Sequence, residues 1–274
     1  MSAPTKDTVR ISVVSLKRAT DRRALMAEEF AKAGLDYAFF DAVDARQEPE
    51  RIAEYADRGP WGQLHAHDKA CTQSHREALE AFVASDDTYC LMLEDDVFLA
   101  SDLKDWLKDM SWWPSDADVV KLERWIDDKL VLVMGKKETE HLGRKVKPLL
   151  SRHSGCAGYL VTKESAAKLL AETGHCMPID HLVFNTSMSP VARLLKIYQV
   201  TPALTVQGNL PSGTELVPAS RPPAQKDLRK DLARAWYELK PIPRFLALLA
   251  SGRAELAKVT WQDKTQNTQQ AEIA

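Results

Sequence analysis

The chain has 274 residues, of which 45% are hydrophobic and 28% are charged, and its formal net charge at pH 7 is −2. This composition is ordinary for a globular protein with a sizeable core, and it excludes a globally basic nucleic-acid-binding protein. The length fits one large α/β domain, or one such domain with an appendage.

The sequence shows neither a signal peptide nor a membrane span, which favours the cytoplasm. Residues 1–7 lack the apolar core of a signal peptide, and no apolar run approaches the length of a membrane span, the run at 245–250 being only six residues long. Four widely spaced cysteines without a C-x-x-C pair favour free thiols over disulfides or a zinc site. These are Cys71, Cys90, Cys156 and Cys176. We expect a cytoplasmic protein with no nucleic-acid partner.

The first forty residues predict a strand, a helix and a second strand. Residues 9–16 are β-branched and apolar, which is typical of a buried strand, and a basic loop at 17–23 follows them. An apolar helical periodicity then runs to Gly34, a residue that commonly ends helices, and 37–40 form the second strand. Such a βαβ-like unit favours a largely parallel sheet.

The rest of the chain predicts further strands and helices in alternation. The expected strands are 89–93, 118–122, 129–134 and 156–161, and the expected helices are 74–84, 163–172 and one beginning near Pro178. Ser74 is the expected N-cap of the helix at 74–84. Proline, glycine and serine gather at 208–225, where we place a boundary. We therefore expect a catalytic domain at 1–220, a basic amphipathic helical appendage at 221–262 and a disordered tail at 263–274.

The strand at 89–93 ends in three consecutive carboxylates, Glu94, Asp95 and Asp96. Carboxylates about 4 Å apart repel one another by roughly 4 kcal/mol at an effective dielectric constant near 20, and a divalent cation relieves that repulsion. Because side chains alternate along a strand, Glu94 and Asp96 point to one side and Asp95 to the other. We therefore predict that Glu94 and Asp96 bind a metal ion, although a solvated acidic turn would have the same sequence.

Three other segments carry candidate functional residues. The basic loop that follows the first strand suits phosphate binding, because guanidinium groups and helix N-terminal amides both favour anions. The segment 69–75 contains a serine and a histidine just before the acidic strand, and Asp180-His181 follow Pro178 at a helix start. His65 and His67 could ligate a metal if this stretch were extended, but no third ligand lies nearby in the sequence.

These segments together resemble glycosyltransferase family 25, the bacterial lipooligosaccharide and lipopolysaccharide sugar transferases. The matching pieces occur in the family's order over roughly 9–185. They are Ser15-Leu16-Lys17-Arg18 with Asp21-Arg22-Arg23, Cys71-Thr72-Gln73-Ser74-His75, Leu93-Glu94-Asp95-Asp96-Val97, Gly158-Tyr159-Leu160-Val161-Thr162 and Pro178-Ile179-Asp180. Two positions depart from the family pattern, since Ser15 replaces an asparagine and Ala70 replaces a glycine.

The resemblance implies a GT-A-like, Rossmann-type mixed and mostly parallel sheet flanked by helices. It also implies a UDP-sugar donor, Mn²⁺ or Mg²⁺, and inverting transfer of a hexose, most often galactose, to a lipopolysaccharide or related glycan. We expect Glu94 and Asp96 to hold the metal and Asp180 to be the general base, with His181 and His75 as alternatives. The residues expected to bind the donor are Ser15, Leu16, Arg18, Arg22, Ser74, His75, Asp95 and Gly158.

Two alternatives to a transferase remain at this stage. In a non-catalytic sugar-nucleotide-binding or scaffold protein, the three consecutive acids would only form a solvated turn. A metal-dependent phosphoester hydrolase would also use clustered carboxylates, but it would need a second cluster for a two-metal site.

The segment 226–258 is basic and amphipathic, with eight Lys or Arg against four acids. Leu228, Leu232, Trp236 and Leu239 recur at helical spacing. Such a segment can lie on an anionic membrane, which would place the protein peripherally at the inner face of the inner membrane. It can equally pack its apolar stripe onto the catalytic domain.

Overall fold

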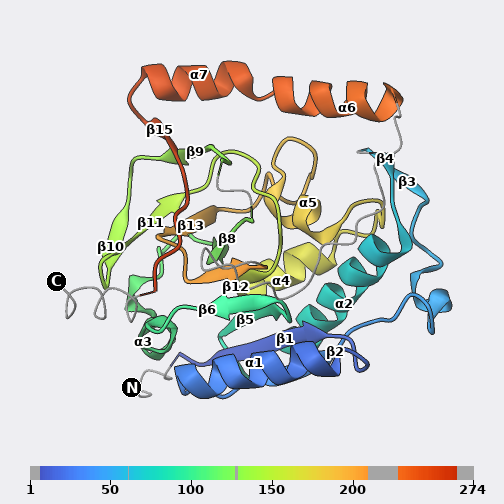
Figure 1. Ribbon diagram of the computed structural model, residues 1–274. Helices are drawn as coiled ribbons and strands as arrows, with labels where there is room; N and C mark the ends of the chain where they lie inside the picture. Colours follow the sequence, from blue (N-terminus) through green and yellow to red (C-terminus); the bar gives the residue numbers. More distant parts are fainter. Residues whose placement is uncertain (1–6, 61, 127–128, 209–227, 264–274) are drawn as a thin grey trace, which may run out of the picture.

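The computed structural model describes residues 7–60, 62–126, 129–208 and 228–263, and it is built around an eight-stranded sheet (Figure 1). The strand order is β10-β11-β13-β7-β12-β5-β1-β2. In that order the strands are Thr139–His141, Arg144–Pro148, Ile197–Thr201, Val119–Lys121, Gly158–Thr162, Tyr89–Glu94, Val9–Ser15 and Ala38–Asp41.

Six of the eight strands point in one direction. β1 is parallel to both β2 and β5, and β7 is parallel to β13. β12 runs antiparallel between β5 and β7, and β11 runs antiparallel between β13 and β10. Only β12 and β11 are thus reversed, which confirms the expected mixed, mostly parallel sheet. The acidic strand β5 lies near its centre, between β12 and β1.

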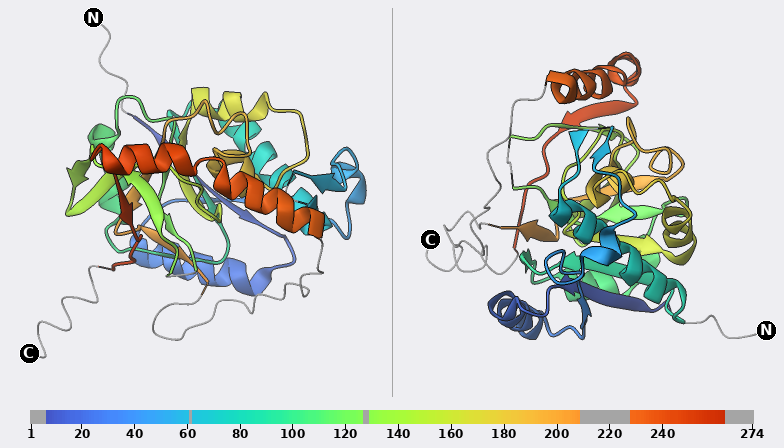
Figure 2. Two further views of the ribbon diagram at one scale, coloured as in Figure 1. Left: turned by 90° about the horizontal axis from the view of Figure 1, so that it is seen from above. Right: turned by 90° about the vertical axis from the view of Figure 1, so that its right-hand side faces the viewer.

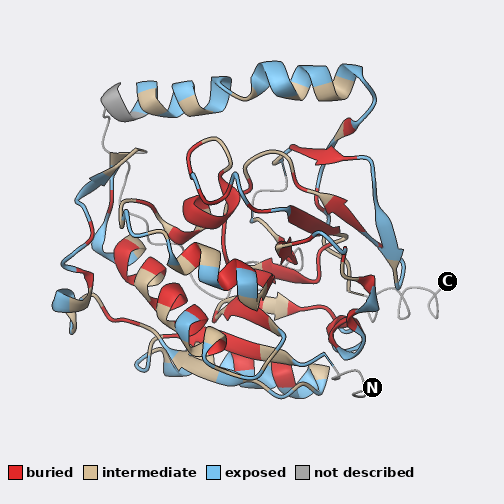
Figure 3. Cartoon of the chain, turned by 180° about the vertical axis from the view of Figure 1, so that it is seen from behind, coloured by how far each residue is buried: buried red, intermediate tan, exposed pale blue. Residues whose placement is uncertain are grey.

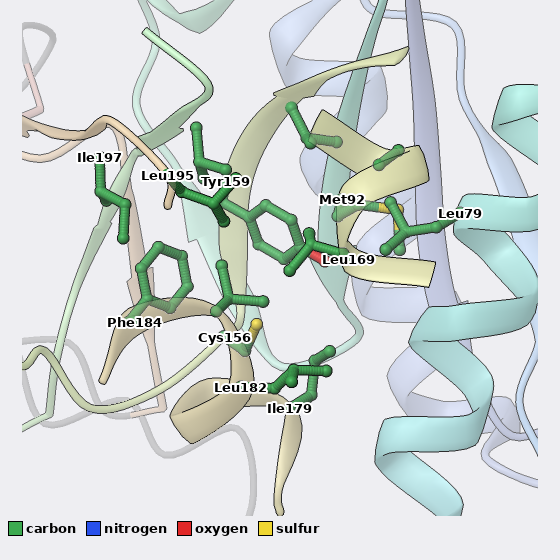
Figure 4. Packing of buried hydrophobic residues seen from close by; sticks show 14 of the residues in the cluster. Leu79, Met92, Cys156, Tyr159, Leu169, Ile179, Leu182, Phe184, Leu195 and Ile197 are labelled. Atoms are coloured by element: carbon green, nitrogen blue, oxygen red, sulfur yellow. The ribbon is translucent and has the colours of Figure 1, made fainter. Parts of the chain in front are cut away.

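Helices cover both faces of the sheet because the apolar side chains of β5 alternate between them. Cys90 and Met92 belong to one buried cluster and Leu91 and Leu93 to the other. The first cluster packs under α2 (Ala66–Val83), α4 (Lys163–Leu170) and α5 (Ile179–Phe184), as Figure 4 shows. The second packs under α1 (Thr20–Ala33) and α3 (Leu103–Lys108). α1 ends at Gly34, whose φ of 61° is left-handed, as its sequence predicted.

Three smaller sheets complete the fold. β6 (Val97–Leu99), β14 (Thr205–Gln207) and β8 (Glu123–Arg124) form one in the order β6-β14-β8. β3 (Arg58–Gly59) pairs with β4 (Gly62–Gln63), and β9 (Leu132–Gly135) pairs with β15 (Ala254–Ala257). Two 3₁₀ turns, η1 and η2, span Pro49–Ile52 and Met110–Trp112. β6 begins directly after the acidic turn, and β14 runs back along β6 to end beside that turn.

The expectation that Ser74 caps a helix over 74–84 is wrong. α2 begins eight residues earlier, at Ala66, and the backbone N–H of His65 donates to the Asp68 carboxylate at 3.3 Å. Ser74 lies in the helix interior, where its hydroxyl donates to Ala70 O at 2.6 Å and accepts from Val43 N–H at 2.9 Å. Because α2 starts at Ala66, the extended spacing proposed for His65 and His67 is also absent.

The C-terminal segment forms α6 (Leu228–Leu239) and α7 (Ile242–Ala250), which lie nearly end to end along one side of the molecule (Figures 1 and 2). Leu232, Trp236 and Leu239 of α6 are 60–64% exposed, and Leu246 of α7 is 61% exposed. Figure 3 shows neither helix with a buried residue among those it describes. The apolar side chains of α6 thus face solvent, whereas Phe245, Leu248 and Leu249 of α7 are half-buried, and both alternatives for this segment stay predictions.

In the described part of the chain, polar and backbone contacts join the appendage to the domain. Arg152 forms a 3.7 Å ion pair with Glu238 of α6, and β15 pairs with β9 beyond α7. Among the described residues, no helix is both long and apolar enough to cross a membrane.

The expected boundary at 220/221 lies outside the described residues. So does the expected tail at 263–274, apart from Asp263, which accepts a hydrogen bond from the Ser101 hydroxyl.

Candidate active site

A cavity of about 500 Å³ opens at the end of the acidic strand β5. Its lining residues include Glu94 of β5 and Gln207 of β14, together with Asp180 and His181 of α5. The β3–β4 hairpin and the first turns of α2 complete it, contributing His65, His67, Asp68 and Cys71 among others. The structure therefore brings together Glu94 and Asp180, two site residues that the sequence predicted from separate segments.

Asp95 points away from its two acidic neighbours, as strand alternation predicted. Its buried carboxylate accepts a hydrogen bond from Ser15 Oγ at 2.6 Å and pairs with Arg22 at 2.8 Å. Burial raises the pKa of Asp95, and the bonds to Ser15 and Arg22 oppose that rise. Asp95 thus ties the acidic turn to the loop that follows β1.

Glu94 and Asp96 share a single side-chain donor, the amide of Gln207. Gln207 Nε2 lies 3.1 Å from Glu94 Oε2 and 3.2 Å from each carboxylate oxygen of Asp96. Burial, followed by the charges of Glu94 and Asp95, raises the pKa of Asp96 to about 7. Two carboxylates converge here on one neutral amide, an arrangement that favours a cation.

Asp180 lies in the first turn of α5, just after Pro178, which is the N-cap residue of that helix. Its carboxylate accepts from the backbone N–H groups of His181 at 2.8 Å and Gly155 at 3.4 Å. Gly155 has a φ of +80°, and a Cβ there would lie 2.3 Å from Glu123 Oε1, so this wall of the cavity requires glycine. The buried His181 ring packs beside Asp180, and its Nδ1 lies 2.8 Å from the Asn185 side-chain amide.

The residues predicted to bind the donor through the basic loop have partners within the protein. Arg18 pairs with Asp44 at 2.5 Å, Arg22 pairs with Asp95, and Leu16 O accepts from Ala19 N–H at 3.0 Å. None of these residues, nor Ser15, lines the described part of the cavity. Their contact with a donor stays a prediction.

Three further predicted donor residues, Ser74, His75 and Gly158, are buried behind the cavity. Ser74 bonds to backbone on both sides, as described above. His75 is fully buried, with Nδ1 3.2 Å from the Tyr159 hydroxyl and Nε2 3.5 Å from Glu94 Oε1. A Cβ on Gly158 would lie 2.2 Å from Thr205 Oγ1, so this glycine allows β14 to approach β12. All three residues therefore contact other parts of the protein, and their contact with a donor stays a prediction.

Gln207 and Trp125 are among the cavity residues that the sequence did not predict. Gln207 carries no motif, and only the pairing of β14 with β6 brings it beside Asp96. Trp125 lines the cavity just after β8, and a tryptophan following a two-residue strand gives no signal in the sequence. An aromatic ring at a polar cavity is a common contact for the apolar face of a sugar or base.

Comparison with known proteins identifies relatives of this chain. A model described as glycosyltransferase family 25 (LPS biosynthesis protein) matches residues 9–183. The chain is 28% identical over 206 residues to the lipooligosaccharide biosynthesis protein lic2B of Haemophilus influenzae, covering 71% of this chain and 74% of that protein. It is also 28% identical over 209 residues to the lacto-N-neotetraose biosynthesis glycosyltransferase LgtE of Neisseria gonorrhoeae, covering 71% and 72%.

Among solved structures, a glycosyltransferase involved in glycosylating the major capsid of PBCV-1 aligns with 83% of this chain and 99% of its own. The sequence identity is 12% and the TM-score is 0.40. The fold assignment rests on the strand order and directions described above.

Proposed function

The chain belongs to glycosyltransferase family 25, whose model spans 175 of its 274 residues, and from this premise we propose the reaction that it catalyses. The protein is a glycosyltransferase of lipooligosaccharide or lipopolysaccharide biosynthesis. We propose that it moves a hexose, galactose in the first instance, from a UDP-sugar to a lipopolysaccharide or related surface glycan. The proposed transfer inverts the anomeric carbon and depends on Mn²⁺ or Mg²⁺.

The observation that supports this proposal most strongly is the position of Glu94 and Asp96 relative to Asp180. Glu94 lines the same cavity as Asp180, and Asp96 adjoins it through Gln207. An acceptor hydroxyl and a donor sugar can therefore meet in one cavity that both Glu94 and Asp180 line. Inverting transfer requires both substrates in one place, because the nucleophile and the leaving group act on opposite faces of the same anomeric carbon.

The residues present fit a divalent cation at the acidic turn. Glu94 and Asp96 supply the hard oxygen ligands that Mn²⁺ and Mg²⁺ prefer. The Oε1 atom of Gln207 is buried and has no hydrogen-bond partner among the described residues, and rotation of the amide by half a turn would present this oxygen to the cation in place of Nε2. Glu94 and Asp96 would hold the cation, which when bound supplies charge stabilisation to the diphosphate leaving group.

Asp180 is the proposed general base. Two backbone N–H groups orient its carboxylate, and Arg152 and His181 lie close enough to interact with its charge. In the proposed step Asp180 takes the proton of the acceptor hydroxyl while that oxygen bonds to the anomeric carbon and the bond to the UDP oxygen breaks. His181 is the alternative base, since burial lowers its pKa and so keeps its imidazole neutral at pH 7.

The exposed stripe of α6 and α7 supports membrane contact by the same enzyme. Leu232, Trp236 and Leu239 of α6 and Leu246 of α7 are exposed, and the same two helices carry Arg234 and Arg244, with Lys240 between them. A basic amphipathic surface of this kind binds anionic lipid, each basic side chain contributing on the order of 1 kcal/mol. We propose that this surface holds the enzyme peripherally at the inner face of the membrane, where a lipid-linked acceptor is presented.

Calorimetry with UDP, Mn²⁺ and both together tests the metal-dependent donor site. Binding of UDP that becomes much tighter when Mn²⁺ is present is the expected result. Tight UDP binding without any turnover of UDP-sugars would support a non-catalytic binding protein instead, and release of inorganic phosphate would indicate a hydrolase.

A further inference from the structure

A second set of metal-ligand atoms lies behind the proposed active site. Cys71 and His75 are one helical turn apart on the same face of α2, and Glu94 faces them from the end of β5. The thiol sulfur, the imidazole nitrogen and the carboxylate oxygen all lie within 4.8 Å of one another. Cys71 Sγ is 3.8 Å from Glu94 Oε1, and His75 Nε2 is 3.5 Å from the same oxygen.

His75 is the observation that points to a ligand here. Its side chain is fully buried, and Nε2 faces Glu94 Oε1 at 3.5 Å without a partner in good hydrogen-bond geometry among the described residues. The Tyr159 hydroxyl lies 3.2 Å from the other ring nitrogen, Nδ1, and fixes the orientation of the ring. Imidazoles that bind metals are oriented in this way, by a hydrogen bond to the nitrogen that does not face the metal. A buried nitrogen without a well-formed hydrogen bond is costly, and a metal ion bound to Nε2 would remove that cost.

We propose that Cys71 Sγ, His75 Nε2 and Glu94 Oε1 bind a thiophilic divalent cation of the Zn²⁺ class. In a tetrahedral zinc site the metal lies about 2.3 Å from sulfur and about 2.0–2.1 Å from nitrogen and oxygen, so bound ligand atoms are roughly 3.3–3.6 Å apart. The two distances from Glu94 Oε1, 3.5 and 3.8 Å, come close to these separations, and the thiol sulfur lies within 4.8 Å of the imidazole nitrogen. Cys71 and Glu94 also line the cavity, which leaves the fourth position to water or to an oxygen of a cavity ligand.

This site differs in position and chemistry from the hard-cation site proposed above. Glu94 Oε1 faces the thiol and the imidazole, whereas Oε2 faces Gln207 on the side of Asp96. Soft sulfur and borderline nitrogen donors select Zn²⁺ over Mg²⁺ or Mn²⁺. As the metal–sulfur bond forms, the thiol proton leaves to solvent. The inference does not depend on the proposed reaction, but a cation held here would share Glu94 with the donor site.

Cobalt spectroscopy on the reduced, metal-free protein tests the site without any sugar substrate. One equivalent of Co²⁺ should produce thiolate-to-cobalt charge-transfer absorption, and Zn²⁺ should abolish it. In competition with a chromophoric chelator, Cys71→Ser and His75→Gln should each bind Zn²⁺ at least tenfold more weakly, since even outer partners of metal ligands contribute about 10–100-fold. Cys176→Ser, a change to another cavity-lining thiol, should bind Zn²⁺ as the parent does.

Two results would overturn the proposal. The first is a cobalt complex without thiolate absorption. The second is undiminished Zn²⁺ affinity in Cys71→Ser, which would make the cluster a hydrogen-bonded chain through Tyr159, His75 and Glu94. A His65→Ala/His67→Ala variant excludes binding by that exposed pair, and it should keep the cobalt absorption.

The parent protein gives a second test that needs no folded variant. Zn²⁺ should slow alkylation of Cys71 at least tenfold, judged by peptide mass spectrometry, and should leave Cys176 unaffected; this scale follows the same ligand energetics. Equal protection of both thiols, or of neither, would contradict the assignment.

Discussion

The side-chain amide of Gln207 donates to both carboxylate oxygens of Asp96, at 3.2 Å each, across 111 residues of sequence. This contact joins β14 to the acidic turn after β5 and places an uncharged donor where two carboxylates converge. An amide donates hydrogen bonds but carries no charge, so it does not remove the repulsion between the carboxylates of Glu94 and Asp96. A bound cation would remove that repulsion.

Replacing Asp96 by Asn should abolish metal-dependent UDP binding while the fold stays intact. Asn is a neutral ligand and removes one of two charged oxygens from the proposed cation site. Calorimetry should show UDP affinity that no longer responds to Mn²⁺, with unchanged circular dichroism. Mn²⁺-dependent UDP binding at parental strength in this variant would contradict the metal assignment.

The stability of the metal-free protein should fall as pH rises through the range in which Asp96 ionises. Its pKa is raised to about 7 in the folded state, from 3.8. Between these values the folded state binds more protons than the unfolded state, so the free energy of unfolding decreases with increasing pH. A shift of this size corresponds to about 4 kcal/mol at 1.36 kcal/mol per unit, and solvent reaching the half-buried group reduces it, so we expect about 1–2 kcal/mol.

Urea denaturation of the parent and of Asp96→Asn at pH 5 and pH 8, both with EDTA, measures this effect. The variant should gain more stability relative to the parent at pH 8 than at pH 5, because pH 5 lies near the lower end of the range over which the effect develops. An equal difference at the two pH values would mean that Asp96 titrates normally.

Replacing Asp180 by Asn should lower turnover far more than it weakens donor binding. A positioned general base contributes about 10²–10⁴-fold, and Asn keeps the shape while losing basicity. Steady-state transfer rates together with UDP calorimetry provide the measurement. If Asp180→Asn transfers within a few-fold of the parent while His181→Asn does not, the proton acceptor is His181.

Vesicle binding should depend on the exposed stripe of α6. Each buried apolar side chain contributes about 1.5–3 kcal/mol, so replacing Leu232, Trp236 and Leu239 by Gln should weaken binding to anionic vesicles more than tenfold. Leu194→Gln provides the control, because Leu194 is 72% exposed and lies outside α6 and α7. Binding by the parent should decrease as salt rises.

Hydrolysis of UDP-galactose in solution should be the same in the stripe variant and the parent. A loss of both hydrolysis and vesicle binding would instead make α6 part of the catalytic domain. Vesicle binding that is unaffected by the three substitutions would place the membrane contact elsewhere.

The sequence predicted those parts of the fold that depend on local patterns. β1 and β5 are continuous apolar runs, α1 ends at a glycine, and the end of a central strand is where α/β sheets bind ligands, so Glu94 could be placed without a structure. Ser74 was misplaced because the true helix start, at His65, has no serine, threonine or proline to mark it.

The remaining features depend on contacts between distant segments. Gln207 reaches Asp96 only through the pairing of β14 with β6, and Cys71 meets Glu94 only because α2 packs beside β5. Spacing along the chain disfavoured zinc, since no C-x-x-C pair exists, whereas the fold assembles a thiol, an imidazole and a carboxylate from two elements. The direction of the α6 stripe is likewise invisible to periodicity, which is the same for a docked and an exposed helix.

The central claim is that this cavity performs metal-dependent, inverting hexosyl transfer. Incubating the purified protein with UDP-galactose and a truncated lipooligosaccharide, with Mn²⁺ or with EDTA, and analysing the product by NMR tests it most directly. The account predicts a new β-linked hexose from the α-linked donor in Mn²⁺ and none in EDTA. An α-linked product, or equal transfer in EDTA, would contradict it.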